Sequence, residues 1–222
     1  SGDGFVAGEA APTAEGSQTA VGTSANTINL NATDKYVAGN YEITELPGTL
    51  AVTATERAIV VVAGSGSKTY DGTALEVKAA TVTYQGEPGS LWAETVEDGQ
   101  SVTLPTGDRV TVHVSGSATN VSDTASGNNK VTFEVENAEY YANVMAVDGD
   151  LEITPRKVTV ATASDSKAYD GTALTNAGVT VSGDGFVAGE AAPTAEGSQT
   201  AVGTSAHTIN LNATDQYVAG NY

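Results

Sequence analysis

The feature that most constrains this chain is a long internal repeat. Residues 1–41 recur as residues 182–222, so the two copies lie 181 positions apart. The copies differ at two places, where Asn26 and Lys35 are replaced by His207 and Gln216. Near-identity at a fixed spacing is typical of tandem-repeat proteins, in which each repeat is one structural module stacked on its neighbours.

A second, shorter repeat sets the boundaries of the modules. Ser67–Leu75 reads SKTYDGTAL, and Ser166–Leu174 reads SKAYDGTAL 99 positions later. Leu50–Thr53 and Leu151–Thr154 each precede a basic residue and a new apolar run, as expected where one module closes and the next begins. We therefore expect three parts: the C-terminal part of a repeat A (1–56, segment A1), a complete repeat B (57–155, unit B) and the N-terminal part of the next repeat A (156–222, segment A2).

By this division, the chain is a segment of an array in which A and B repeats alternate. Segment A1 would lack the opening strands of its repeat, and segment A2 would lack the closing strand. We expect neither part to bury a complete core alone. Either the array continues beyond these residues, or neighbouring chains complete each other by adding a strand to an open sheet edge.

Alternation of apolar and polar residues predicts an all-β fold. Thr and Val supply 57 of the 222 residues, and both are β-branched. The alternating segments predict half-buried antiparallel strands at Leu75–Val77 leading into Ala80–Tyr84, and at Arg109–Ser115, Lys130–Glu136, Asp150–Thr154 and Thr208–Leu211. Several short strands in each stretch of ~80–100 residues favour tandem Ig-like β-sandwich repeats, with Trp92 capping or filling the core of unit B. A β-grasp-like unit is the alternative.

Composition excludes several classes of function. The formal net charge is −18, which argues against binding to nucleic acid or to an anionic membrane surface. The chain has no Cys and two His, of which His113 is expected on the solvent face of its strand. No apolar stretch is long enough to insert into a membrane. No paired carboxylates, Ser-His-Asp pattern or phosphate loop appears, so we expect no enzyme activity.

The motif Lys-x-Tyr-Asp-Gly-Thr-x-Leu, at residues 68–75 and 167–174, resembles the signature of the YDG and MBG-type extracellular repeats of bacterial surface adhesins. The segments that end each module, Gly39–Tyr41 and Tyr140–Asn143, are similar to the ending of that family. The resemblance covers every module. It implies an Ig-like or related β-fold in a secreted, extracellular stalk on the bacterial cell surface, and no catalytic residues.

The motif residues are expected to have a structural role. Tyr70, Asp71 and Gly72, and their counterparts Tyr169, Asp170 and Gly171, predict a turn in which Asp accepts backbone N–H groups and Tyr packs at a sheet corner. The competing interpretation is a Ca²⁺ ligand, for which Asp71, Asp170 and Asp123 are the candidates. Because Ca²⁺ takes 6–8 oxygens and each candidate is a single carboxylate, we expect no cofactor.

A self-formed isopeptide crosslink is a further possibility. Lys157, on an early strand of repeat A, and Asn221, near its end, have the chain order that such a bond requires. Unit B carries Arg57 in place of the lysine.

Three functions follow from these observations. The first is a structural stalk or spacer whose partners are neighbouring repeats of the same protein. The second is a module that binds a host glycan or matrix protein through the loops of unit B, within residues 85–130. The third is a self-assembling fibre in which the split repeat A is completed by strand complementation.

Overall fold

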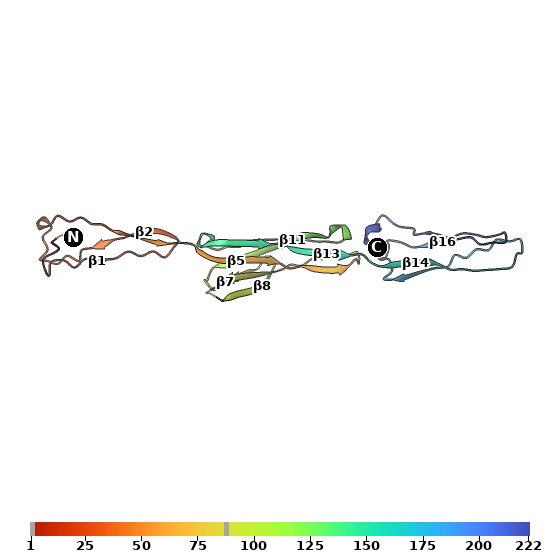
Figure 1. Cartoon of the computed structure of the whole chain (residues 1–222), viewed down its shortest axis with the longest axis horizontal. Helices are drawn as coiled ribbons and strands as arrows, with labels where there is room; N and C mark the ends of the chain where they lie inside the picture. Colours follow the sequence, from red (N-terminus) through yellow and green to blue (C-terminus); the bar gives the residue numbers. More distant parts are fainter. Residues whose placement is uncertain (1–2, 87–88) are drawn as a thin grey trace.

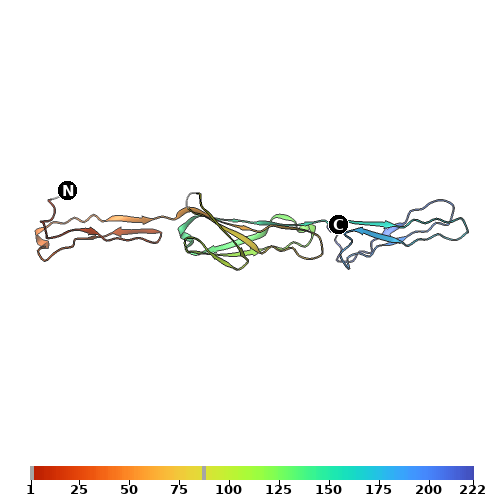
Figure 2. The same ribbon diagram turned by 90° about the horizontal axis from the view of Figure 1, so that it is seen from below.

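The computed structural model describes residues 3–86 and 89–222, and the described chain is all-β. Its three parts lie end to end along one axis, as two perpendicular views agree (Figures 1 and 2). Segment A1 forms one end, unit B the middle and segment A2 the other end. The C-terminus lies close to unit B (Figure 1). Within the described residues, no helix could cross a lipid bilayer.

Unit B consists of two sheets. The four-stranded sheet has the order β12-β5-β7-β8, and its strands are β5 (Thr55–Ala63), β7 (Ala79–Gln85), β8 (Leu91–Glu97) and β12 (Tyr141–Val147). The five-stranded sheet has the order β6-β13-β11-β10-β9, and its strands are β6 (Gly66–Thr69), β9 (Ser101–Thr103), β10 (Arg109–Ser115), β11 (Ala125–Val135) and β13 (Gly149–Thr154). The described residues also form short 3₁₀ turns. In unit B these are Val121–Asp123 and Ala138–Tyr140, and segments A1 and A2 contain Ala38–Asn40 and Ala219–Asn221.

One hydrophobic core lies between the two sheets of unit B. Its members from the four-stranded sheet include Ile59, Val61 and Val82, and those from the five-stranded sheet include Val110 and Val112. All of these side chains are 0% exposed. The alternation of β-branched and polar residues produces this arrangement, because every second side chain of a strand points to the same face.

The alternating segments confirm most of the strand predictions. Arg109–Ser115 is β10, Asp150–Thr154 falls in β13, and His113 is exposed as expected. Trp92 is half-buried and packs against the core. The prediction for Leu75–Val77 was wrong, because this stretch forms only an isolated bridge between Leu75 and Ala118.

The first and last strands of unit B both change sheet. β6 follows β5 along the chain, and β13 follows β12. In the four-stranded sheet β5 pairs in parallel with β12, and in the five-stranded sheet β6 pairs in parallel with β13. At the crossing point the chains approach so closely that a Cβ atom on Gly149 would lie 2.2 Å from the carbonyl oxygen of Gly64. Only glycine fits there.

Segments A1 and A2 contain two-stranded sheets. In A1, β1 (Thr13–Ala14) pairs with β3 (Ile28–Asn29), and β2 (Gly22–Asn26) pairs with β4 (Gly48–Val52). In A2, β14 (Val158–Thr162) pairs with β15 (Val179–Gly183), and β16 (Thr194–Glu196) pairs with β17 (Thr208–Asn210). Among the described residues of both segments, Ala195 is the one buried apolar side chain. Their packing is therefore much thinner than that of unit B.

Candidate functional site

The two copies of the Tyr-Asp-Gly-Thr motif form the same turn. In the first copy, Asp71 Oδ1 accepts hydrogen bonds from Thr73 N at 2.9 Å and from Lys68 Nζ at 2.8 Å. Asp170 makes the equivalent bonds to Thr172 N and Lys167 Nζ, both at 2.9 Å. The glycine that follows each aspartate has a positive φ, +79° and +80°. This is the turn that the sequence predicts, since glycine adopts such a backbone at no steric cost.

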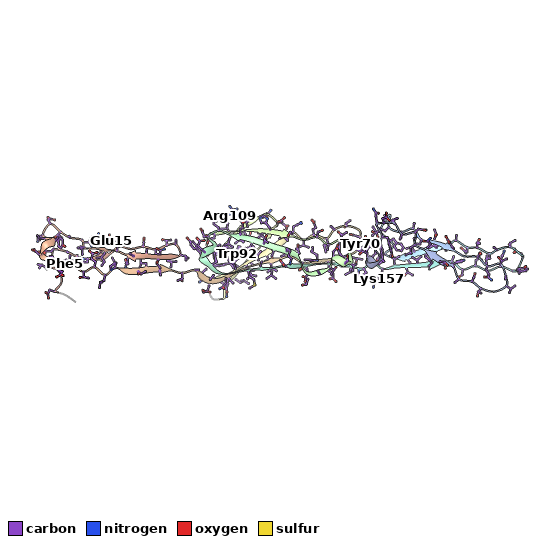
Figure 3. All side chains as sticks on the ribbon, turned by 90° about the horizontal axis from the view of Figure 1, so that it is seen from above. Phe5, Glu15, Tyr70, Trp92, Arg109 and Lys157 are labelled. Atoms are coloured by element: carbon purple, nitrogen blue, oxygen red, sulfur yellow. The ribbon has the colours of Figure 1, made fainter. Side chains whose placement is uncertain are left out.

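The tyrosines of the two motifs differ sharply in burial. Tyr70 is 3% exposed, whereas Tyr169 is 68% exposed. Because the local turn is the same, the difference arises from what packs on each tyrosine. Tyr70 lies at the boundary between unit B and segment A2 (Figure 3), while Tyr169 lines an open groove within A2.

Glu190 of segment A2 is the centre of this boundary. One of its carboxylate oxygens accepts a hydrogen bond from the Tyr70 hydroxyl, and the other accepts one from the Tyr222 hydroxyl at 2.7 Å. Glu190 is 4% exposed, so the two phenols take the place of water around a buried carboxylate. Burial, together with the bond to Glu190, raises the pKa of Tyr222 to about 12 and also raises the pKa of Tyr70.

Asn221 provides a second polar contact across the boundary. Its side chain is 0% exposed. Its Oδ1 accepts a hydrogen bond from Val121 N at 2.9 Å, and its Nδ2 donates to Asn120 Oδ1 at 2.8 Å. Both polar atoms of the side chain are thus bonded to the 3₁₀ turn region of unit B.

Arg156, at the covalent connection, makes a third contact. Its guanidinium donates to the carbonyl oxygens of Gly185 at 2.6 Å and Tyr70 at 3.3 Å, and therefore links the two parts. Apolar packing completes the boundary, since Val187 and Tyr222 of A2 pack on the buried cluster that contains Tyr70. We call this set the joint. Its members are Tyr70, Asn120, Val121, Arg156, Val187, Glu190, Asn221 and Tyr222.

The A2 side of the joint has an exposed copy at the other end of the molecule, near Phe5 (Figure 3). There Tyr41 donates to Glu9 at 2.5 Å and accepts from Val6 N at 3.1 Å, as Tyr222 does with its own partners. Val6 is 62% exposed, and Asn40, the counterpart of Asn221, is exposed. The same bonds therefore form in an exposed copy in A1 and in a copy packed on unit B in A2.

Unit B has a tyrosine–carboxylate pair at the end that faces A1, similar to the Tyr222–Glu190 pair of the joint. The hydroxyl of Tyr141 donates to Asp108, and burial together with this bond raises the pKa of Tyr141 to about 12. The same bond holds the pKa of Asp108 below its usual value. An open groove of about 480 Å³ lies beside this pair and is also lined by Val21 and Val52 of A1. A phenol–carboxylate pair thus recurs at corresponding ends of A and B modules.

The structure gives the calcium interpretation no support. Asp71 and Asp170 are each bonded to a lysine ammonium, which occupies the place a cation would take. Asp123 Oδ2 accepts from Thr119 N and Asn120 N at 2.9 and 2.8 Å. Across residues 3–86 and 89–222, no group of three or more His, Asp or Glu side chains could hold a metal ion.

The isopeptide candidates are not brought together by the observed contacts. Both polar atoms of the Asn221 side chain are bonded to Asn120 and Val121. Lys157 instead contacts Asp184 through its backbone N, at 3.2 Å. This geometry does not favour a bond between Lys157 and Asn221.

Sequence reasoning found the motif turn but missed the joint. The Tyr70–Glu190 contact spans 120 residues, and no local pattern connects them. Glu9 and Tyr41 recur as Glu190 and Tyr222, but the two copies differ at only two of 41 positions, so the repeat does not single out this pair. In comparisons with known proteins, no family model, curated protein or solved structure matches this chain.

Proposed function

We propose that this chain is a structural stalk or spacer segment of a bacterial surface adhesin or fibre, without catalytic activity. Its modules would be Ig-like β-sandwich repeats displayed outside the cell, and its partners the neighbouring repeats. The observation that carries the proposal is the burial of Tyr70 against Glu190 of the next module. The resemblance of the two motifs to extracellular adhesin repeats supports it independently.

The joint restricts bending between modules. A short covalent link alone would leave the direction of the next module free. Here three side chains of segment A2 attach to unit B. Glu190 bonds the motif tyrosine Tyr70, and Asn221 bonds the 3₁₀ turn region of unit B. Arg156, at the link, bonds the carbonyl oxygen of Tyr70. Attachments at three separate places fix an orientation, whereas one attachment fixes only a distance. The alignment of unit B with segment A2 in Figure 1 agrees with this constraint.

The surface charge fits a spacer. A net charge of −18 keeps neighbouring stalks soluble and apart by repulsion. Because the repeat copies differ at only two of 41 positions, the length of such a stalk can change by whole modules with no change in surface chemistry.

Small-angle X-ray scattering of the full chain tests the proposal. We expect the wild type to scatter as a rod, and Tyr70→Ser to lower the radius of gyration and broaden the distance distribution because the joint loosens. Tyr169→Ser is the matched control, since it changes the same motif where the tyrosine is exposed. Scattering from Tyr70→Ser identical to that of Tyr169→Ser would show that the joint does not stiffen the chain and would refute the proposal.

A further inference from the structure

Strand β12 forms one edge of the four-stranded sheet of unit B. It pairs with β5 on one side, and within the described residues no strand pairs with its other side. Both sheets of unit B are built by residues 55–154, so this free edge is a property of the unit itself. β5 runs along the length of the molecule (Figure 1), and β12 lies beside it, so the free edge extends along the side of the unit.

The exposed side chains of β12 are mostly apolar. Met145 is 58% exposed, Val144 is 47% exposed, and Val147 is also exposed. Met145 and Val147 lie on the face of the sheet turned away from the core, beside the exposed Val62, whereas Val144 lies on the other face. Apolar surface is therefore present on both faces of this edge.

The corresponding segment of repeat A carries charges and a proline. Tyr41 and Tyr141 occupy equivalent places, since each follows a 3₁₀ turn and donates to a carboxylate. The six residues after Tyr41 include Glu42, Glu45 and Pro47, whereas the six after Tyr141 include no charge and no proline. Charged side chains and proline are common means by which an edge strand is kept from pairing with another strand. Unit B lacks this protection at β12.

We propose that β12 pairs antiparallel with β12 of a second copy of the chain, so that the two four-stranded sheets join into one continuous sheet. Main-chain hydrogen bonds along a free edge supply the affinity in this mode of recognition. A two-fold axis at Val144, the middle of the strand, places every residue of Tyr141–Val147 opposite a residue of the second copy. Val144 then lies opposite itself, and Asn143 lies opposite Met145 of the second copy. The inference does not rest on the proposed stalk function.

Charge favours a second copy as the occupant. With a net charge of −18, two copies repel each other over most of their surface, whereas β12 brings no charged side chain into the contact. The carboxylate of Glu56, on the neighbouring β5, accepts a hydrogen bond from Asn143 Nδ2 at 3.1 Å and so has a partner of its own. A basic or acidic peptide would find no charged partner on β12. An uncharged strand with the same exposed apolar side chains fits it better.

The charges that flank β12 determine the register. Glu139 precedes the strand and Asp148 follows it, and both stay outside the paired residues when the axis lies at Val144. Asp148 is also bonded to Lys130 Nζ at 2.7 Å. A shift of the second copy by two residues in either direction would bring one of these two acids into the pairing. A shift by one residue would place outward-facing side chains opposite core-facing ones.

Sedimentation equilibrium of the full chain tests the pairing. We expect the average mass to rise from that of a monomer towards that of a dimer as the concentration increases. The association should strengthen with added salt, because salt screens the repulsion between two acidic chains. A chain that remains a monomer at every concentration and ionic strength would overturn the proposal.

Met145→Glu gives β12 the charge that repeat A carries at Glu45. We expect it to weaken dimerisation at least 10-fold, since each copy then brings a carboxylate into an apolar contact. The Met145 side chain is exposed, so the fold should be kept, which near-ultraviolet circular dichroism checks. Thr103→Glu is the matched control, because it adds the same charge at an exposed position of β9, an edge strand of the other sheet. It should dimerise as the wild type does, and equal weakening by both substitutions would overturn β12 as the contact.

Disulfide formation tests the register, because the chain has no cysteine of its own. Val144→Cys should form a covalent dimer under mild oxidation, since directly opposite Cβ atoms lie about 4.5–5.5 Å apart. Ala146→Cys, also exposed and on the same face, should not, because the two cysteines would lie four residues apart along the paired strands. Equal crosslinking of the two variants would indicate a parallel or variable alignment and would refute the proposal.

Discussion

The hydroxyl of Tyr70 donates a hydrogen bond to Glu190, 120 residues away, and both side chains are buried by the contact. The equivalent glutamate of the first repeat copy, Glu9, is bonded to Tyr41 alone among the described tyrosines. The chain therefore contains a buried and an exposed copy of one surface. This pairing supplies an internal control for each substitution at the joint.

Glu190→Gln should destabilise the chain. The amide has one acceptor oxygen for two buried phenol donors, so one hydroxyl loses its partner, at a cost of about 1–3 kcal/mol in the free energy of unfolding. Thermal unfolding monitored by near-ultraviolet circular dichroism measures this loss. Glu9→Gln, in the exposed copy, should cost clearly less. Equal effects of the two substitutions would contradict the role of the joint.

Asn221→Ala should also destabilise, because it leaves Val121 N and Asn120 Oδ1 without the partner they have across the joint. We expect a loss of about 1–3 kcal/mol in urea unfolding. Asn40→Ala changes the same repeat position where the side chain is exposed, and should leave the transition midpoint unchanged. A similar midpoint shift for both variants would count against the contact.

Alkaline pH should weaken the phenol–carboxylate contacts at both ends of unit B. The pKa values of Tyr222 and Tyr141 are raised from 10.0 to about 12, so their protonated forms are favoured in the folded chain. The resulting stability is complete below pH 10 and is lost as the pH rises towards about 12. Absorbance at 295 nm should show tyrosines that ionise late, together with a loss of near-ultraviolet dichroism. Ionisation of every tyrosine near pH 10, with no late phase, would refute this prediction.

Gly149→Ala should be strongly destabilising, while Gly48→Ala should be tolerated. A Cβ atom at Gly149 would lie 2.2 Å from Gly64 O, which is backbone and cannot move aside cheaply. At Gly48, the counterpart in A1, the nearest atom is 3.9 Å away. We expect a loss of about 2–4 kcal/mol for the first substitution, in the range of overpacked or strained sites, and less than about 0.5 kcal/mol for the second. Urea unfolding of the two variants compares them, and a stable Gly149→Ala chain would contradict the close crossing.

The strands were predictable where their pattern is local and long. Arg109–Ser115 alternates over a whole strand, and one face of it is buried. Leu75–Val77 alternates over only three residues, and there the isolated contact with Ala118 decides the conformation. The strand order was not predictable, because β12 returns to lie parallel to β5 from about 85 residues away, a pairing that turn chemistry does not encode.

In the candidate site, too, local features were predictable from the sequence and long-range contacts were not. The turn at Asp71 and Gly72 depends on neighbours within five residues, so the motif revealed it. The partner of Tyr70 depends on how one module meets the next. Only the structure brings Glu190 to this tyrosine, since each of them is an ordinary surface residue by its local sequence.

The parallel pairing of the first and last strands of unit B determines how the module would respond to tension. The chain enters at Thr55, at one end of the module, and leaves at Thr154, at the other (Figure 1). A pulling force would slide β5 and β6 past β12 and β13 along their length. The hydrogen bonds of both parallel pairings would then be loaded together in shear. They would have to break at the same time and could not break one after another. Such a module resists unfolding along the direction of pull, as the stalk function that we propose would require.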